Sequence, residues 1–454
     1  MAALLPAVIR DFAVPFADLD TAAWTVTGYL GAYAAVLMLA GRAIDRGAAD
    51  AARIGAIALF GTGSAACGLA GDLVPLVAAR TAQGVGAGVL VPLALSEAAS
   101  GGSVADRVAR LGLVMAVAEG GAVLGPLYGA AFVALADWRW AFWTNVPVAA
   151  ALVVTWAPHL RLGHLARLRG AIGAADALAA AAVAVLVVGV SREAARAGGW
   201  TPWIAGILAA AGLAVAARLG SWWRGPGGVA TAAALLAHLA LGVALVTPLV
   251  LVPVWASTLL GREPQTAALV LLRATLAIPP FAVLGGLAAP RVGRGLVAAG
   301  GFAVAALGLW LMARWPADVT EAGMTPALVI AGAGLGTLLA PTTEALLDVA
   351  AARDSAARLG WATATRVVGM AAGLAVMTAW GVDRFTERVR AILLQGQPVS
   401  GAQVGVPLEA YRRAATDAGV EVLGTLFLAG ALAATMGALC IVVALRGRGT
   451  LRPG

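Results

Sequence analysis

Apolar runs of membrane-spanning length recur from one end of this chain to the other, separated by short stretches that carry Arg, Gly or Pro. A helix needs about 20 predominantly apolar residues to cross the hydrocarbon core of a bilayer. Hydrophobic residues make up 61% of the 454 residues and charged residues 12%, whereas soluble domains average about 45–50% and about 25%. The pattern excludes a water-soluble globular enzyme and predicts an all-α polytopic membrane protein.

The runs predict thirteen complete spans, preceded by a short apolar helix at 1–9. We expect this first helix to be truncated, because it is about half as long as a span. It is not a signal peptide, since neither a basic stretch nor a cleavage site accompanies it. The complete spans are predicted near 24–40, 54–70, 76–95, 111–136, 140–156, 176–191, 203–218, 235–260, 267–289, 296–313, 325–343, 359–380 and 423–445.

The distribution of charge predicts the topology. The net charge of +8 comes from Arg alone, since the chain has no Lys, and the basic residues form no long run of the kind that binds nucleic acid. Alternate connections carry at least two Arg each, which predicts that they and both termini are cytoplasmic, in a bacterial plasma membrane. The segment 381–422 also holds five Arg. Long loops count little in this rule, and its amphipathic spacing predicts a periplasmic cap or linker.

An internal repeat relates the two ends of the chain. The loop 41–47 after the second span has a partner at 286–294 after the tenth, and glycines in the fourth and fifth spans recur in the twelfth and thirteenth at an offset of 248 residues. The matched positions are Gly84 with Gly332, Gly86 with Gly334, Gly88 with Gly336, Gly121 with Gly369, and Gly125 with Gly373. Spans 2, 4 and 5 therefore correspond to spans 10, 12 and 13.

The repeat predicts two six-helix bundles with two further helices inserted between them. The N-terminal bundle is 1–156, with its first helix incomplete, and a basic linker with the inserted helices is 157–224. The C-terminal bundle is 225–454 and includes the outer segment 381–422. Two parallel repeats related by an axis along the membrane normal are typical of the major facilitator fold, in which one half rocks against the other.

Ionisable side chains within the spans are candidate functional residues, because each costs about 2.5–3.5 kcal/mol at the centre of a membrane helix. Glu119 in the fifth span and Arg366 in the thirteenth are 247 residues apart, so they occupy nearly matching depths of the two repeats. One hypothesis is that Glu119 binds and releases a proton while Arg366 favours its charged form. The other is a static ion pair that keeps the halves in register.

Three more polar residues within the spans have open interpretations. Arg80 and Gln83 share one face of the fourth span. Arg80 is expected either to face a cavity and meet a carboxylate of the first helix, or to extend to the membrane interface. Arg273 has no evident partner in the sequence and either extends outward or lines a cavity.

Candidate gating residues lie at two places. Asp45, followed by Arg46 at the cytoplasmic end of the second span, is expected to cap a neighbouring helix N-terminus or to pair with an Arg across the loop. Such a contact would hold the cytoplasmic side closed, whereas the alternative is an ordinary solvated loop charge. Gly125 and Pro126 lie within the fifth span, where Pro removes a backbone donor. They predict either a hinge or a packing kink.

No metal site or cofactor is expected. Cys67 and Cys440 both lie in apolar runs, so neither a disulfide framework nor a thiolate metal site can be built from them. His159 and His164 lie in the basic linker, and His238 lies near the start of the ninth span. None has neighbours that suit a metal, and we interpret all three as non-catalytic.

Three segments carry a resemblance to a known family. Arg80-Thr-Ala-Gln83-Gly84-Val-Gly86, 119–129 and 137–147 resemble the fourteen-helix drug:proton antiporter branch of the major facilitator superfamily. Within that branch, the similarity to mycobacterial triacylglyceride exporters that work with a periplasmic lipoprotein extends over nearly the whole chain. The segments that carry this closer similarity are 119–129, 315–316, 366–370 and 379–385.

The resemblance implies proton-driven export of lipids or lipophilic compounds by alternating access, with Glu119 and Arg366 at the functional core. It also implies a periplasmic lipoprotein partner. The chain departs from the family at three points: the acidic residue of the family's first helix has no counterpart, 48–50 replace a Gly and basic residues, and the outer segment 315–326 is shorter.

The favoured hypothesis is a proton-coupled exporter whose partners are a lipid or lipophilic small molecule, protons and the membrane. General multidrug efflux is the alternative, and a transport-inactive relic is a third reading because the first helix is incomplete. A membrane-embedded lipid-modifying enzyme is a remote alternative, because it needs a nucleophile or paired carboxylates at the membrane interface.

Overall fold

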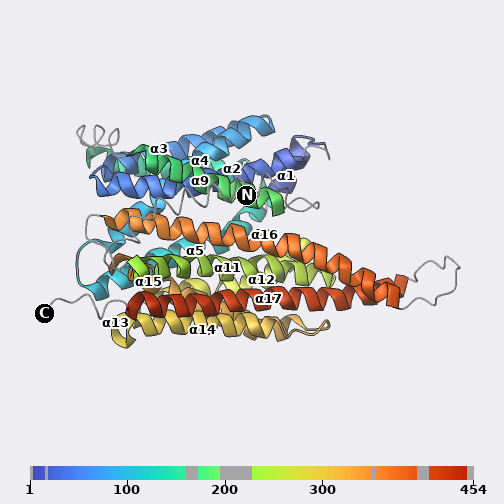
Figure 1. Cartoon of the computed structure of the whole chain (residues 1–454). Coiled ribbons are helices and arrows are strands. Elements are labelled where there is room, and N and C mark those ends of the chain that lie inside the picture. Colours follow the sequence, from blue (N-terminus) through green and yellow to red (C-terminus); the bar gives the residue numbers. More distant parts are fainter. Residues whose placement is uncertain are drawn as a thin grey trace.

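In the computed structural model, long helices run side by side in two bundles, with the N-terminal half beside the C-terminal half (Figure 1). The structure describes residues 4–15, 19–159, 172–194, 228–348, 354–395 and 408–446. Among them, eleven helices are long and apolar enough to cross a membrane, with a shorter apolar helix at Ala174–Val190. This described part contains no strand. The predicted all-α polytopic fold is confirmed.

The N-terminal half agrees with the predicted spans to within a few residues, except that the span predicted at 140–156 is interrupted at Thr144. Its helices are α1 (Leu5–Asp11), α2 (Leu19–Asp45), α3 (Ala49–Leu69), α4 (Leu73–Ala99), α5 (Val104–Leu135), α6 (Trp140–Trp143) and α7 (Asn145–Trp156), followed by the 3₁₀ turn η2 (Ala157–His159). The short α1 packs through Val8 against Leu76 and Trp138, and Asp11 pairs with Arg139 at 2.8 Å.

One helix of the predicted inserted pair is α9 (Ala174–Ala194). The other, predicted at 203–218, lies outside the described residues, as does most of the basic linker. The C-terminal half consists of α11 (Gly228–Thr258), α12 (Pro264–Thr275), α13 (Ile278–Val292), α14 (Arg294–Met312), α15 (Glu321–Asp348), α16 (Ser355–Gln395) and α17 (Leu408–Arg446). The span predicted at 267–289 is present as one apolar stretch, Leu269–Val292. Its helix is interrupted at 276–277, because Pro279 and Pro280 cannot continue a helix and instead begin α13.

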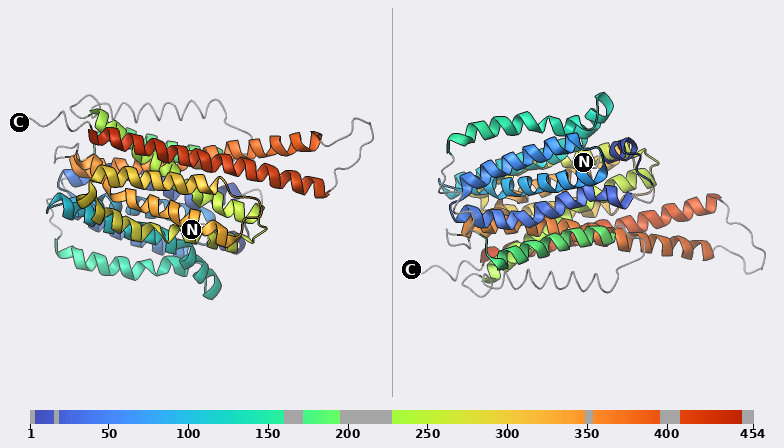
Figure 2. Two further views of the ribbon diagram at one scale, coloured as in Figure 1. Left: turned by 90° about the horizontal axis from the view of Figure 1, so that it is seen from below. Right: turned by 90° about the horizontal axis from the view of Figure 1, so that it is seen from above.

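The last two helices are far longer than a membrane requires. With 41 residues in α16, its length is about 60 Å, twice the hydrocarbon thickness. Figures 1 and 2 show α16 and α17 projecting together beyond every other helix. The outer segment predicted as a cap or linker is therefore largely helix, and we call its described parts, 381–395 and 408–422, the α16–α17 extension. The opposite end of the molecule, where α2 ends, is the Asp45 end.

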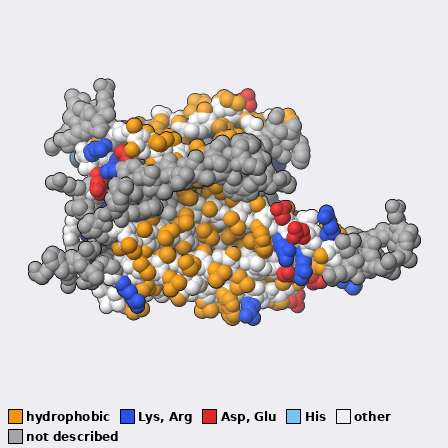
Figure 3. Space-filling view, viewed as in Figure 1, with side chains coloured by type: hydrophobic (Ala, Val, Ile, Leu, Met, Phe, Trp, Pro, Cys, Tyr) orange, Lys and Arg blue, Asp and Glu red, His pale blue; other side chains and the backbone are white. Residues whose placement is uncertain are grey.

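The surface separates into an apolar belt and charged ends. In Figure 3, hydrophobic side chains cover the middle of the visible face, and acidic and basic side chains gather where the α16–α17 extension begins. Large apolar side chains remain exposed along the belt, such as Leu432 and Leu439 of α17. Since lipid tails are as apolar as these side chains, a membrane covers them without loss.

Two crossings join the halves near the Asp45 end, and both are made by glycines. Where α2 crosses α16, a Cβ at Gly41 would lie 2.4 Å from the Ala356 oxygen, and one at Gly360 would lie 2.3 Å from the Leu37 oxygen. Where α5 crosses α13, a Cβ at Gly112 would lie 2.7 Å from the Ala282 oxygen. Such distances leave no room for a side chain, so the backbones pack directly against each other.

The two crossings are related by the internal repeat. Gly286 of α13, whose Cβ would lie 2.9 Å from the Val108 oxygen, is the repeat partner of Gly41. Gly360 follows Gly112 by 248 residues, which is the offset of the repeat. Helix α9 packs against both α2 and α16, so it covers one crossing, and Arg42 of α2 reaches Asp176 of α9 at 3.3 Å.

We expect Gly360→Leu to open the α2–α16 crossing, because overpacking a tight site costs about 1–3 kcal/mol. The measurement is the rate at which a maleimide labels a cysteine placed at the buried Thr363 in purified protein, and the rate should rise about fivefold or more. Gly300→Leu is the control, since a Cβ there has nothing within 4 Å. Equal labelling rates for both variants would contradict the role of the crossing.

Candidate functional site

The predicted pair of Glu119 and Arg366 meets between the halves. Arg366 Nη1 of α16 donates to Glu119 Oε1 of α5 at 2.9 Å, and the two side chains are 20% and 16% exposed. Gly242 of α11 allows close approach to α16 here, because a Cβ at this glycine would lie 2.1 Å from the Arg366 oxygen. The pair therefore satisfies two charges that are costly inside a membrane.

Beside this pair lies a cavity of about 290 Å³ that is lined by both halves. Apart from the pair, its walls are almost wholly apolar. The lining residues are Leu90, Val91, Ala94, Leu95, Val114, Met115, Val117, Ala118, Glu119, His238, Leu241, Leu339, Thr343, Ala362, Thr363 and Arg366. The few polar groups converge on one apolar space, which is the usual composition of a binding site for a lipophilic ligand.

His238 is a member of this site that sequence reasoning missed. Its ring is buried, with Nδ1 2.8 Å from the Ala234 oxygen and Nε2 3.4 Å from Thr343 Oγ1 of α15. Since a carbonyl only accepts, Nδ1 carries a proton and donates it to the Ala234 oxygen. The available signal was that His238 lies inside an apolar span, whereas the linker histidines do not.

Asp45 binds the opposite half. Its two carboxylate oxygens accept hydrogen bonds from the backbone N–H groups of Ala356 and Ala357, at 2.9 and 2.8 Å, in the first turn of α16. The carboxylate thus caps the positive end of a helix dipole, one of the two contacts proposed from the sequence. Arg42, one turn earlier in α2, reaches Asp354 at 3.5 Å, and Arg46 lies in the exposed turn that follows α2.

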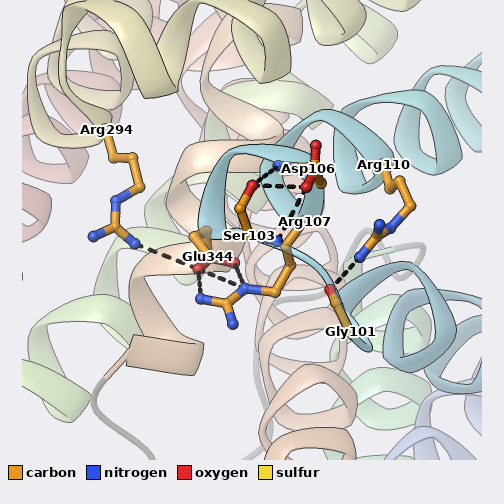
Figure 4. A network of polar contacts seen from close by, with 7 residues as sticks. All are labelled: Gly101, Ser103, Asp106, Arg107, Arg110, Arg294 and Glu344. Carbon is orange, nitrogen blue, oxygen red and sulfur yellow. Dashed lines mark hydrogen bonds and ion pairs between the residues drawn. The ribbon is translucent and has the colours of Figure 1, made fainter.

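A second polar contact joins the halves at the same end. Arg107 Nε of α5 lies 2.9 and 3.0 Å from the two carboxylate oxygens of Glu344 in α15, and Nη2 also donates to Oε1. Arg294 Nη1 of α14 approaches the same carboxylate at 3.4 Å. Figure 4 shows Glu344 between the two guanidinium groups, and its side chain is fully buried. The sequence did not predict this contact.

Two repeat-related helix N-termini at this end, those of α5 and α16, are capped differently. Helix α5 carries its own capping box, in which Ser103 Oγ accepts from the Asp106 N–H and Asp106 accepts from the Ser103 N–H. Helix α16 receives Asp45 from the other half instead. The repeat partner of Asp45 is Pro290 in the last turn of α13, which has no carboxylate. Only one of the two repeat-related caps therefore links the halves.

The comparison with known proteins decides the family. The model of the Major Facilitator Superfamily matches residues 1–373. This chain belongs to the major facilitator superfamily. It is a membrane transporter and not an enzyme.

Named relatives come from mycobacteria. The chain is 33% identical to the triacylglyceride transporter of Mycolicibacterium hassiacum, over 92% of this chain and 83% of the relative. It is 31% identical to a probable triacylglyceride transporter of Mycobacterium leprae, over 84% and 80%. The triacylglyceride transporter of Mycobacterium tuberculosis is 33% identical, over 84% and 78%.

Solved structures support the same fold. The human organic anion transporter aligns with a TM-score of 0.60 at 13% identity, covering 95% of this chain and 94% of that one. The proton:xylose symporter, bound to 6-bromo-6-deoxy-D-glucose, aligns with a TM-score of 0.56 at 14% identity, covering 95% and 90%. At these identities the likeness establishes the major facilitator fold alone.

The structure resolves the alternatives for Arg80 and Gln83. Arg80 is buried, where it donates to the Thr25 oxygen at 3.2 Å and to Gln83, and its guanidinium lies 4.1 Å from the centre of the Tyr29 ring. Gln83 also donates to Ser64 Oγ at 2.6 Å. Both residues lie inside the N-terminal half and neither lines the central cavity, so Arg80 does not extend to the interface.

Arg273 does have a partner, contrary to what the sequence indicated. Its Nη2 lies 3.1 Å from Glu321 Oε2 at the start of α15, and Arg262 reaches the other carboxylate oxygen at 2.9 Å. These contacts lie within the C-terminal half, and Arg273 does not line the central cavity. Gly125 is exposed, and α5 continues through Gly125 and Pro126 without interruption; the Pro126 side chain lies outside the described residues.

We expect Arg107→Ala to weaken closure of the Asp45 end by about 2 kcal/mol, the low end of the range for a buried charge pair, because Arg294 still faces Glu344. Hydrogen exchange should then quicken at the backbone amides of 340–347 in α15. Arg110→Ala is the control, because Arg110 bonds only backbone oxygens of its own half among the described residues. Unchanged exchange of these amides in Arg107→Ala would contradict the assignment.

Proposed function

We propose that this transporter exports lipids or lipophilic compounds, driven by the proton gradient, by alternating access. The single observation that carries the proposal is the charge pair Glu119–Arg366 at the edge of an apolar cavity between the halves. The apolar walls suit a lipophilic cargo better than a sugar, which needs amides and hydroxyls. The names of the relatives favour a triacylglyceride or a similar lipid as cargo.

Proton coupling follows because the Glu119 carboxylate either pairs with Arg366 or binds a proton. The ionised carboxylate attracts Arg366 at 2.9 Å, and this contact holds the halves together. A proton on Glu119 removes that attraction and leaves Arg366 to the cavity. Without this attraction the halves separate more easily at the Asp45 end. Because an alternating-access transporter opens only one end at a time, protonation favours the conformation that is open at the Asp45 end.

We assign the Asp45 end to the cytoplasm. Of the ion pairs between described residues, three join the N-terminal and C-terminal halves directly: Arg42–Asp354, Arg107–Glu344 and Glu119–Arg366. None lies on the extension side of Glu119, so this conformation is closed at the Asp45 end. The Arg-rich short connections favour a cytoplasmic location for that end in a bacterial plasma membrane, with both termini on this side. The α16–α17 extension then lies in the periplasm, where a lipid-accepting lipoprotein can reach it.

The cavity also bears on the alternative cargo. Its volume of about 290 Å³ is at the lower limit of sites that enclose drug-sized ligands. A lipid with several acyl chains must therefore extend beyond it or bind when the halves separate. General multidrug efflux stays the second candidate for this reason.

The proton-coupling proposal predicts that Glu119→Gln abolishes transport driven by a pH gradient, because the neutral amide mimics a permanently protonated carboxyl. Transport of a labelled lipid in reconstituted vesicles is measured with and without the gradient. Glu321→Gln serves as the control, since Glu321 pairs with Arg273 inside one half. If Glu119→Gln retains the gradient dependence of the parent, Glu119 is not the coupling residue.

The cargo proposal predicts that fluorescent triacylglycerol moves across the vesicle membrane faster than a lipophilic cationic dye under the same gradient. Both are offered to the same preparation, and the Glu119→Gln variant gives the background. Gradient-driven movement of the dye without movement of the lipid would establish the multidrug alternative instead.

A further inference from the structure

A second cavity, of about 770 Å³, lies within the C-terminal half between α11, α16 and α17. It shares no lining residue with the central cavity. Most of its wall is apolar, and two of its threonine hydroxyls already donate to carbonyls of their own helices, Thr258 to Val254 and Thr378 to Leu374. The interior therefore offers little that would recognise a polar metabolite, and its size is that of a ligand site.

The cavity crosses the boundary between the apolar belt and the charged extension. On α16 the exposed apolar side chains reach Val382, and the next charged residue after Arg366 is Asp383. On α17 the last charged residue before the apolar stretch is Glu421. Figure 3 shows the charged side chains gathered at this level. One part of the wall, including Met377 and Leu426, belongs to the apolar belt, and the other part lies among charges.

The charged part of the wall contains an arginine available to a ligand. Arg412 is exposed and lines the cavity beside Tyr411. Among the described residues, no carboxylate forms an ion pair with it, not even Glu409 three residues earlier. Two extension arginines of α16 differ, since Arg384 pairs with Glu387 at 3.2 Å and Arg388 pairs with Glu421 at 2.6 Å.

An apolar chamber in the belt with a cation at its charged rim fits one kind of molecule. A phospholipid of the adjoining leaflet places its acyl chain at the depth of Met377 and its phosphate at the depth of Arg412. Arginine suits this phosphate, because its guanidinium matches phosphate geometry. A zwitterionic headgroup would add a second cation beside Arg412, so an anionic headgroup is the better complement.

We propose that this cavity binds one anionic phospholipid, with an acyl chain between α11, α16 and α17 and the headgroup phosphate at Arg412. The site is distinct from the central cavity and does not depend on proton coupling or on the transported cargo. The bound lipid holds the base of the α16–α17 extension against α11.

Native mass spectrometry of the purified protein with added lipid tests the proposal. Phosphatidylglycerol and phosphatidylcholine with identical chains are compared, and one phosphatidylglycerol should be retained in preference. Arg412→Gln should lower this retention roughly fivefold, the effect of one Arg near an anionic lipid surface. Arg413→Gln is the control, because Arg413 is the adjacent exposed arginine but does not line the cavity.

Ala415→Phe gives an independent test, because its side chain fills the apolar part of the cavity while Arg412 stays unmutated. This variant should no longer retain phosphatidylglycerol. Glu119→Gln should retain the lipid as the parent does, which separates this site from the proposed transport mechanism. Four results would each overturn the proposal. They are equal retention of the two lipids by the parent, equal effects of the two arginine variants, full retention by Ala415→Phe, and displacement of phosphatidylglycerol by triacylglycerol.

Discussion

Direct backbone contact at the two glycine crossings determines how the two halves of the protein fit together. It fixes the position of α2 along the axis of α16, and the position of α5 along the axis of α13. Glu119 lies seven residues beyond Gly112, and Arg366 lies six residues beyond Gly360, so both are about 10 Å further along their helices. The crossings thereby bring a carboxylate and a guanidinium to one depth, where they form the pair across the cavity.

The polar contacts at the Asp45 end depend on the same crossings. Their carboxylates differ in whether they find another partner when the halves separate. Glu344 loses Arg107 but keeps Arg294, which belongs to its own half. Asp45 loses the N–H groups of α16, and its carboxylate then returns to water at the end of α2. Glu119 has no such substitute among the described charged residues. Protonation removes the charge of Glu119 and with it the free-energy cost of separating Glu119 from Arg366. The Glu119 carboxylate is therefore able to control the equilibrium between the closed and open conformations of the Asp45 end.

The sequence predicted most of the helices and the central pair, because both follow from local rules. Apolar run length predicts a span, and the repeat offset placed Glu119 and Arg366 at matching depths before any contact was known. The break between α12 and α13 was missed although Pro279 and Pro280 signal it. The amphipathic spacing of 381–422 predicted a cap or linker. That this segment continues α16 and α17 was not predicted, because the stretch is too polar to be counted as part of a span.

Contacts between distant helices were harder to predict. The partners of Arg273 and Arg107 lie in α15, 48 and 237 residues away, and no periodicity connects such positions. His238 was dismissed for lack of metal ligands, yet its role as a wall of the central cavity depends only on which helices surround α11. Tertiary packing decides which partners these residues have, and the position of His238 inside an apolar span was the one signal in the sequence.

Double electron–electron resonance, which measures the distance between two spin labels, tests whether protonation of Glu119 opens the Asp45 end. Labels at Val104 and Leu296, both exposed near the Asp45 end, report its opening in a background with Cys67 and Cys440 replaced by Ala. The account predicts that the distance lengthens as the pH falls and that Glu119→Gln gives the long distance at every pH. A distance that responds to pH equally in the parent and in Glu119→Gln would contradict it.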